Sequence, residues 1–318
     1  MIGREEIICE RLKDAHDVLV VSHIRPDADA VGSMLGLGLA LQNTGKKVQM
    51  VLSEPVPVSF RFLPGSEQIR RRAEGQFDTI IVVDCSELSR VGAALDGYPQ
   101  PDICIDHHAT NLSFAALNFV LSEAVATAAV LAEYLPVWGY QITPPVAQAL
   151  LSGLIGDTIG FRTSNMTADT LRLAAKLTEA GADLHDVYDR TLVKRSFQAV
   201  KYWGQGLSHL QRDEWIAWTC LTLEDRKVVG YTGNDDADLV NVISGIDGAH
   251  VVVMFVEQFA GKVKISWRSQ NGIDVSKLAL HFGGGGHRAA SGAEVTGNLA
   301  EVMEEVLRET RKVVQQYS

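Results

Sequence analysis

The first 160 residues repeatedly place an acidic or imidazole side chain at the end of an apolar run or at the start of a helical pattern. The segments concerned are His23-x-x-x-Asp27-x-Asp29, Asp84, Asp106-His107-His108 and Asp157. Open α/β sheets build their binding sites at the carboxyl ends of the strands. This placement constrains the fold, because such a sheet would gather distant segments at a single edge.

The apolar runs in this part of the chain predict strands at residues 18–21, 47–52, 79–83 and 103–105. Helical patterns over residues 31–42, 124–134, 145–155 and 168–179 alternate with or follow them. Continuous β-branched runs, without strict polar alternation, are typical of parallel strands covered by helices on both faces. We expect an α/β fold with a doubly wound, mostly parallel sheet.

The pattern changes after Gly181, which suits the end of the preceding helix. Residues 186–210 predict one helix without strand signals, and a strand pattern resumes at residues 216–221. A hairpin is predicted from residues 249–257 and 262–269, turning at Gly261. We therefore expect a catalytic domain over 1–185, a linker helix over 186–212 and a smaller α/β substrate-binding domain over 213–318.

The composition of the chain limits the classes of substrate and binding partner that it can have. A net charge of -10 argues against tight binding of long nucleic acid, because that binding needs many lysines and arginines facing phosphates. Apolar runs fall short of the length needed to span a bilayer, and the N-terminal sequence lacks a basic region followed by an apolar core. The four cysteines show no C-x-x-C spacing, which favours reduced thiols. We expect a cytoplasmic protein with a small substrate.

Three potential metal ligands follow the first predicted strand within seven residues: His23, Asp27 and Asp29. Pro26 fixes the backbone of the turn that carries them. Both aspartates can point to the same side, with the small Ala28 between them. A capping role for one aspartate at the start of the next helix is the alternative interpretation.

Asp84, Asp106 and Asp157 occupy comparable positions, the first two after strands and the third at the end of an apolar helix. Asp84 alone could be a turn former. His107 and His108 are neighbours on an extended chain and should face opposite ways. We expect His107 to bind metal and His108 to act as a general acid or phosphate contact; two surface histidines are the alternative. Asp157 could instead be a buried aspartate satisfied by backbone donors.

Together the segments supply enough ligands for two cations roughly 3.5–4 Å apart that share a carboxylate, as two-metal hydrolases require. Carboxylates and imidazoles accept manganese, magnesium, cobalt or zinc. The pattern therefore predicts hydrolysis of a phosphate ester. The candidate ligands are His23, Asp27, Asp29, Asp84, His107 and Asp157.

A distant motif, Phe282-Gly-Gly-Gly-Gly-His287-Arg288, predicts an anion site. Consecutive glycines let backbone N–H groups converge on phosphate oxygens, although such a run can also be a flexible turn. Arg268, on the preceding predicted strand, could clamp a phosphate through its planar guanidinium, unless it is only a solvated charge. The candidate substrate-binding residues are Arg268, Gly284, Gly285, Gly286, His287 and Arg288.

In this order, the motifs resemble the DHH phosphoesterase family with its C-terminal DHH-associated domain, and the resemblance covers nearly the whole chain. Short two-domain members of this kind are similar to the nanoRNase and pAp-phosphatase type. The resemblance implies cleavage of very short oligoribonucleotides, removal of the 3'-phosphate of adenosine 3',5'-bisphosphate (pAp), and use of two divalent ions, with manganese favoured.

The resemblance also assigns roles to residues of this sequence. It implies that Asp84 bridges two ions, one held also by His23 and Asp27, the other by Asp29, His107 and Asp157. It implies that His108 faces the scissile phosphate and that Asp106 orients an imidazole. Two departures from the family pattern, Ala28 in place of glycine and Ser291 before Gly292, concern loop detail.

Several alternatives stay open at this level. Hydrolysis of pApA or of a cyclic dinucleotide would use the same ligands, as would a pyrophosphatase or exopolyphosphatase. A catalytically silent nucleotide-binding module would be expected to lack some ligands. The sequence does not fix the preferred substrate, cleavage polarity, base preference, native metal or oligomeric state, a homodimer included.

Overall fold

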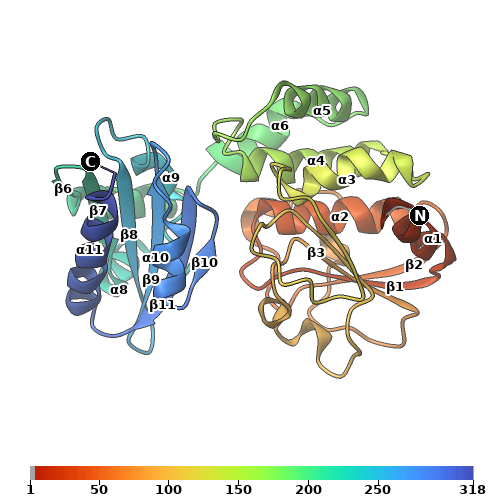
Figure 1. Ribbon diagram of the computed structural model, residues 1–318, viewed down its shortest axis with the longest axis horizontal. Coiled ribbons are helices and arrows are strands. Elements are labelled where there is room, and N and C mark those ends of the chain that lie inside the picture. The colour runs from red at the N-terminus through yellow and green to blue at the C-terminus, as the bar shows by residue number, and fades with distance from the viewer. Residues whose placement is uncertain (1–3, 318) are drawn as a thin grey trace. The chain divides into compact units, whose positions relative to one another are not determined.

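The computed structural model describes residues 4–317, and the chain divides into two compact units at Lys194 and Arg195. The first unit contains a five-stranded, all-parallel sheet with the strand order β2-β1-β3-β4-β5 (Figure 1). This confirms the predicted parallel α/β sheet. Its strands are β1 (Asp17–Val21), β2 (Lys47–Val51), β3 (Thr79–Val83), β4 (Ile103–Asp106) and β5 (Leu117–Val120).

Alternate residues of these strands pack in two separate cores. Val18, Val20, Ile81 and Val83 join the large core formed with the helices, whereas Leu19 and its alternating neighbours face a small core around the 3-10 segment η3 (Leu88–Leu95). The α-helices thus cover one face, and short turns and loops cover the other, so the helical cover expected on both faces is present on one. The helices of the unit are α1 (Arg4–Asp14), α2 (Ala28–Gln42), α3 (Thr127–Val137), α4 (Pro144–Asp157) and α5 (Ala168–Glu179); the 3-10 turns η1 (Val58–Phe60) and η2 (Ser66–Gln68) lie in the loop after β2.

The expected single linker helix over 186–212 is wrong. The segment contains α6 (Leu184–Tyr188), the π-turn η4 (Asp189–Val193), α7 (Phe197–Ser208) and the short strand β6 (Gln211–Asp213). The backbone of Lys194 is extended, and the Ser196 side chain accepts a hydrogen bond from Ala199 N at 3.1 Å, which starts a new helix. A serine that can cap competes with helix continuation. The boundary between the units falls at this break.

The second unit contains a six-stranded mixed sheet, with the order β10-β11-β9-β8-β7-β6. The strands after β6 are β7 (Ile216–Leu221), β8 (Val251–Gln258), β9 (Lys262–Ser269), β10 (Gly285–Gly286) and β11 (Ala290–Thr296). Only β7 and β8 pair in parallel among these neighbours. The predicted hairpin is confirmed as β8 and β9, and Gly261 adopts a positive φ of 66° at its turn.

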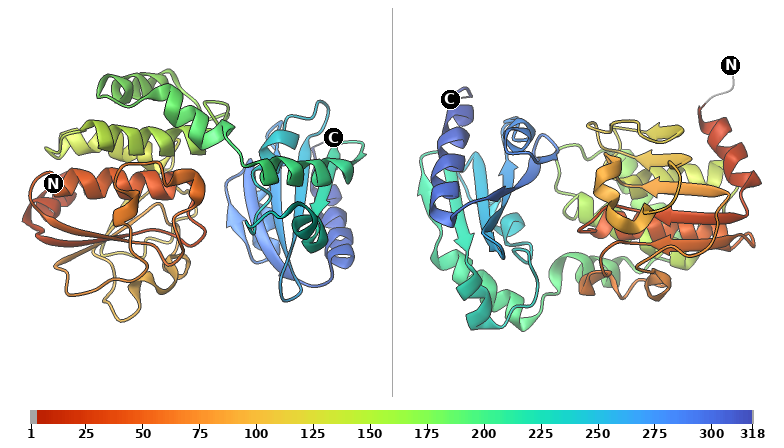
Figure 2. Two further views of the ribbon diagram at one scale, coloured as in Figure 1. Left: turned by 180° about the vertical axis from the view of Figure 1, so that it is seen from behind. Right: turned by 90° about the horizontal axis from the view of Figure 1, so that it is seen from below.

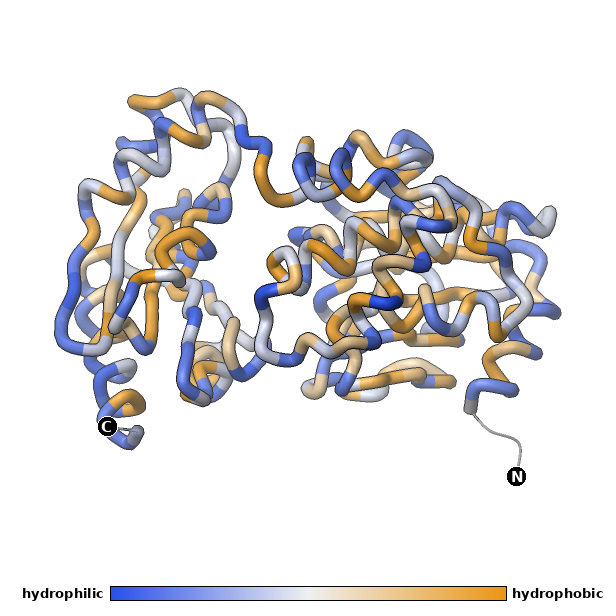
Figure 3. Tube along the Cα trace, turned by 90° about the horizontal axis from the view of Figure 1, so that it is seen from above, coloured by the Kyte–Doolittle hydropathy of each residue, from blue (hydrophilic) through white to orange (hydrophobic). Residues whose placement is uncertain are grey.

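Helices pack on both faces of this second sheet (Figure 2). On one face, α10 (Ser276–His281) and α11 (Leu299–Val314) contribute to a core around Trp267. On the other, Tyr202 of α7 packs in a core with residues of α9 (Leu239–Ile243); α8 (Leu223–Val229) follows β7. Hydrophobic and hydrophilic segments alternate along α11 near the C-terminus in Figure 3, as expected for a helix with one buried face.

Among residues 4–317, every helix is too short or too polar to cross a membrane. The four cysteines carry free thiols, and Cys85 and Cys104 are buried. Burial raises the pKa of the Cys85 thiol to about 12, which makes it a poor nucleophile at neutral pH. These findings agree with the expectation of reduced structural cysteines.

Candidate metal centre

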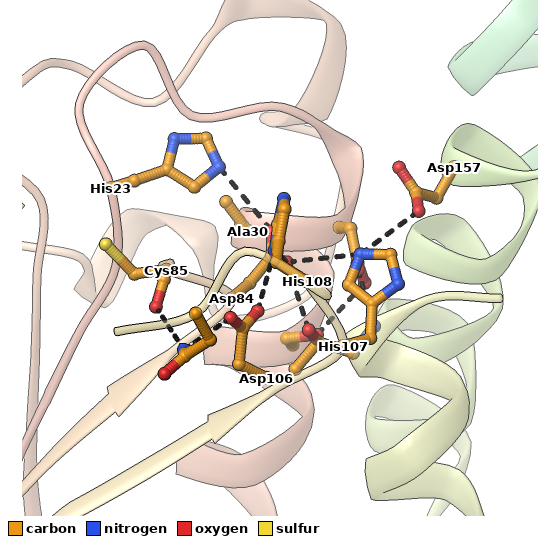
Figure 4. Close-up of polar contacts among 12 residues, drawn as sticks. His23, Ala30, Asp84, Cys85, Asp106, His107, His108 and Asp157 are labelled. Atoms are coloured by element: carbon orange, nitrogen blue, oxygen red, sulfur yellow. Dashed lines mark hydrogen bonds and ion pairs between the residues drawn. The ribbon is translucent and has the colours of Figure 1, made fainter. Parts of the chain in front are cut away.

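Two neighbouring strands deliver acidic residues to the same edge of the first sheet. Asp106 is the last residue of β4, and Asp84 follows the last residue of β3. Asp84 has a positive φ of 53° and donates its N–H to Ile105 O at 3.0 Å. This turn conformation costs energy for a residue other than glycine, and neighbouring contacts must hold it. Figure 4 shows both carboxylates beside His107 and His108.

The turn after β1 carries the first histidine and two aspartates. Asp27 is the N-cap of α2, and its Oδ1 accepts hydrogen bonds from Asp29 N at 3.1 Å and Ala30 N at 3.0 Å. The capping interpretation is therefore correct for Asp27. It does not remove Asp27 from the cluster, because the side chain is 61% exposed and His23 Nε2 lies 3.8 Å from the same oxygen.

His23, Asp27 and Asp84 form the first cluster of potential metal ligands. Their nearest ligand atoms all lie within 4.8 Å of one another. His23 Nε2 lies 3.5 Å from Asp84 Oδ2, while His23 Nδ1 lies 2.8 Å from Ile24 O. The backbone carbonyl thus favours a proton on Nδ1 and leaves Nε2 directed toward the carboxylates.

Asp29, Asp84 and His107 form a second cluster of the same compactness. His107 Nε2 lies 3.8 Å from Asp84 Oδ1, 3.9 Å from Asp29 Oδ2 and 3.4 Å from Asp157 Oδ2. Its other ring nitrogen lies 3.2 Å from Ala124 O. Asp157 is the last residue of α4, and Figure 4 shows its carboxylate pointing at His107. Asp84 belongs to both clusters.

Asp29 is held by contacts that sequence reasoning missed. Its carboxylate accepts hydrogen bonds from Thr127 N at 2.6 Å and Ala128 N at 2.8 Å, and therefore caps the N-terminus of α3 from another helix. Ser33 Oγ donates to the same carboxylate at 3.1 Å. A Cβ on Gly153 would lie 2.8 Å from Asp29 Oδ1, so glycine lets α4 approach. The helix predicted over 124–134 begins at Thr127 in the structure, and the preference of threonine for helix starts was the available signal.

Asp106 and His108 form a separate pair within the same site. His108 Nδ1 lies 2.7 Å from Asp106 Oδ1, and Asn111 Nδ2 donates to Asp106 Oδ2 at 2.6 Å. Asp106 is completely buried, whereas the His108 side chain retains 14% exposure. The closest partners of the two histidines differ, but His107 Nε2 and His108 Nδ1 each lie 3.8 Å from Asp84 Oδ1, and the ring centroids are 4.7 Å apart. The expected opposite directions of the two side chains are therefore wrong.

The electrostatics of the site favour a bound cation. Burial, together with the charges of Asp27 and Asp84, raises the pKa of Asp157 well above its ordinary value. Burial also lowers the basicity of His108, but its hydrogen bond to Asp106 and the charge of Asp84 outweigh this and raise its pKa to about 9. Crowded oxygen donors with two imidazole nitrogens match the ligand preferences of hard divalent ions. The residues present therefore fit the metal centre that the sequence predicts.

The glycine run in the second unit differs from the predicted anion nest. Gly283 N, Gly284 N and His287 N each donate to a backbone carbonyl, those of Leu280, Ala279 and Ala290. These three N–H groups are therefore used within the fold, and the expected convergence of free donors at them is wrong. The glycines serve a close approach instead: a Cβ on Gly284 would lie 2.1 Å from Gly292 O. Gly285 and Gly286 pair with Gly292 and Ser291 as strand β10.

The predicted cationic residues of the second unit are positioned by polar contacts. Arg268 lies on β9; its Nε donates to Asn241 Oδ1 at 3.0 Å and one terminal nitrogen donates to Trp267 O at 3.0 Å. Arg288 donates twice to Gly272 O, at 3.1 and 2.6 Å. Arg288 thus ties two loops together, while Asn241, which sequence reasoning missed, fixes the direction of Arg268.

Comparisons with known proteins agree with this architecture. Residues 17–154 match the model of the DHH family, N-terminal domain, and residues 227–316 match that of the DHHA1 domain. The chain is similar to the bifunctional oligoribonuclease and PAP phosphatase NrnA of Thermus thermophilus, with 34% identity over 96% of this chain and 93% of the relative. It is 30% identical to the protein of that name from Mycoplasma genitalium, over 95% and 96%.

A solved structure extends the similarity to the whole fold. An exopolyphosphatase-related protein from Bacteroides fragilis superimposes with a TM-score of 0.88 at 26% identity, covering 99% of this chain and 96% of that one. The two matched domains and the coverage of nearly the whole chain thus agree with relatives of similar length. The chain therefore belongs to the DHH family of phosphoesterases.

Proposed function

We propose that this chain is a two-metal phosphoesterase that hydrolyses short oligoribonucleotides and removes the 3'-phosphate of pAp. The observation that carries the proposal is the sharing of Asp84 by two ligand clusters, one with His23 and Asp27, the other with Asp29 and His107. Two cations that share a carboxylate are the arrangement used for in-line displacement at phosphorus. The names of the two NrnA relatives support the choice of substrates.

The six proposed ligands are His23, Asp27, Asp29, Asp84, His107 and Asp157. When bound, the cations would neutralise charge on the phosphoryl oxygens and lower the pKa of water. We favour manganese, because a mixed set of carboxylate and imidazole ligands accepts it readily; magnesium, cobalt and zinc share these ligands. The side chains themselves supply preorganised negative charge in a buried site.

His108 is the proposed contact to the scissile phosphate. Its Nδ1 is engaged with Asp106, and we assign the substrate contact to the other ring nitrogen, Nε2. A raised pKa keeps the imidazole protonated near neutral pH, and a protonated imidazole can donate a hydrogen bond or a proton to a phosphate oxygen. Asp106, fixed by Asn111, orients the ring and remains the proposed partner acid.

Arg268, together with His287, is the proposed phosphate-binding group of the second unit. Its guanidinium can donate two parallel hydrogen bonds to a phosphate and is already aligned by Asn241. Arg288 is engaged with Gly272 and contributes to the shape of the glycine loop. The substrates are small nucleotides and short oligonucleotides, consistent with the net charge of -10.

One comparison tests the proposal. Release of phosphate and nucleotide would be measured with manganese for pAp, pApA, a five-nucleotide RNA, pyrophosphate and polyphosphate under the same conditions. Turnover of pAp and the RNA, abolished by a chelator, supports the proposal. Activity confined to pyrophosphate or polyphosphate would reject it in favour of the chemistry suggested by the name of the Bacteroides relative. Inactivity on every substrate would reject the proposal and favour a catalytically silent nucleotide-binding protein.

Asp84→Asn tests the role of the metal centre in turnover, and Asp102→Asn is its matched control. Asp84 is the shared carboxylate, whereas Asp102 pairs with Arg11 at 2.8 Å outside both ligand clusters. Both changes remove one charge and keep the side-chain shape. Loss of turnover in the first variant alone would assign the effect to the metal centre.

A further inference from the structure

The N-terminus of α3 contacts two of the proposed ligands at once. Thr127 N donates to Asp29 Oδ2 at 2.6 Å, and Thr127 Oγ1 donates to Asp84 Oδ1 at 3.0 Å. Asp29 belongs to α2 and Asp84 to the turn after β3. One residue therefore joins two carboxylates that come from segments 55 positions apart in the sequence.

We propose that Thr127 is a positioning residue that holds Asp29 and Asp84 at the spacing required by two cations. This inference rests on the proposed function. Thr127 has no exposed surface, and neither does Ala128, whose N–H completes the pair of donors to Asp29. The hydrogen bonds that Thr127 and Ala128 donate are therefore buried in the protein, away from solvent.

The hydroxyl has a role that the backbone cannot supply. Asp84 adopts a positive φ of 53°, so its side chain leaves the strand in an unusual direction. His23 contacts its Oδ2, while Thr127 fixes its Oδ1. A buried carboxylate oxygen that loses such a donor is left partly unsatisfied and can rotate toward another partner. Outer contacts of this kind change metal affinity or activity by about 10–100-fold when they are removed.

The experiment compares Thr127→Val with Thr127→Ser. Valine keeps the branched shape and removes the hydroxyl, whereas serine keeps the hydroxyl and removes the methyl. Binding of Mn²⁺ to the metal-free protein would be measured by calorimetry, alongside pAp hydrolysis at increasing Mn²⁺. The expected result is about 10–100-fold weaker Mn²⁺ binding in the valine variant, near-normal binding in the serine variant, and recovery of valine-variant activity at high Mn²⁺.

Thr310→Val is the matched control. Thr310 is also a fully buried threonine, but it lies in α11 and its hydroxyl contacts Trp267 Nε1 and Val306 O. This variant should lose stability and keep the Mn²⁺ affinity of the unaltered protein. If Thr127→Val does not fold, Thr127→Ala, which lacks both γ groups, is compared with Thr127→Ser, which lacks only the methyl group.

The outcomes separate this inference from the proposed function. Equal Mn²⁺ affinity in the valine variant and the unaltered protein would overturn the role of Thr127 and leave the metal centre intact. Equal impairment of the valine and serine variants would also overturn it, because the hydroxyl would then not be the cause. If the unaltered protein itself bound no Mn²⁺, the proposed function would fail first.

Discussion

Asp106 Oδ1 and His108 Nδ1 lie 2.7 Å apart, and this short contact gives the second histidine of the motif a task different from that of the first. Asp106→Asn should therefore lower kcat by about 10²–10⁴-fold, the usual contribution of a positioned proton donor. Mn²⁺ affinity should change little, because His108 and Asp106 stand outside the six proposed ligands. Steady-state kinetics and calorimetry on the same sample check both. A large loss of Mn²⁺ affinity would instead make Asp106 a metal ligand.

The stability of the metal-free protein should report the protonation of His108. The pKa of His108 is raised from 6.5 to about 9 in the fold. Protonated His108 therefore stabilises the fold fully below pH about 6.5, and that contribution is lost as the pH rises through about 9. Denaturant unfolding in a chelator, compared between the unaltered protein and His108→Gln, should show a stability difference that shrinks over this window. A stability difference between the two proteins that stayed constant with pH would show that protonation of His108 does not stabilise the fold.

Addition of Mn²⁺ should stabilise the first unit strongly. A ligand that binds only the folded state at 100 times its Kd adds about 2.7 kcal/mol. The crowded carboxylates favour a large effect, because burial and then the charges of Asp27 and Asp84 raise the pKa of Asp157, and a bound cation favours its charged form. Thermal unfolding with and without Mn²⁺ checks this, and Asp84→Asn should remove most of the shift. An equal shift in Asp84→Asn would point to binding elsewhere.

Arg268→Ala should raise KM for nucleotides by about 10–100-fold, because a hydrogen bond to a charged group contributes about 1.5–3 kcal/mol. Arg268→Lys should restore little, since an ammonium cannot reproduce the fork of a guanidinium. Asn241→Ala should have a smaller effect in the same direction, because Asn241 only aligns the Nε of Arg268. Kinetics on pAp at saturating Mn²⁺ measure these changes. An unchanged KM in all three variants would remove Arg268 from the substrate site.

The sequence predicts four of the five parallel strands because continuous β-branched runs leave few alternatives; the run at 79–83 ends with β3, and the run at 103–105 ends one residue before β4. The fifth strand, β5, lacks such a run and was not predicted. The sequence also predicts which segments hold the candidate ligands. It does not predict Asn111 or Ser33, whose importance depends on side chains that meet only in the folded chain. The glycine run is the opposite case: its composition suggests free donors, but carbonyls of α10 accept from Gly283 N and Gly284 N, and Ala290 O of β11 accepts from His287 N.

The glycine run should tolerate substitution at one position and not at its neighbour. A Cβ on Gly284 would meet Gly292 O at 2.1 Å and Ala293 Cα at 2.7 Å, whereas a Cβ on Gly285 meets nothing within 4 Å. Gly284→Ala must therefore shift β11 and should destabilise the second unit by about 1–3 kcal/mol, the usual cost of overpacking. Gly285→Ala, the matched control, should retain stability in denaturant unfolding. If both variants unfolded at the same denaturant concentration, the close approach to β11 would not be the reason for glycine at position 284.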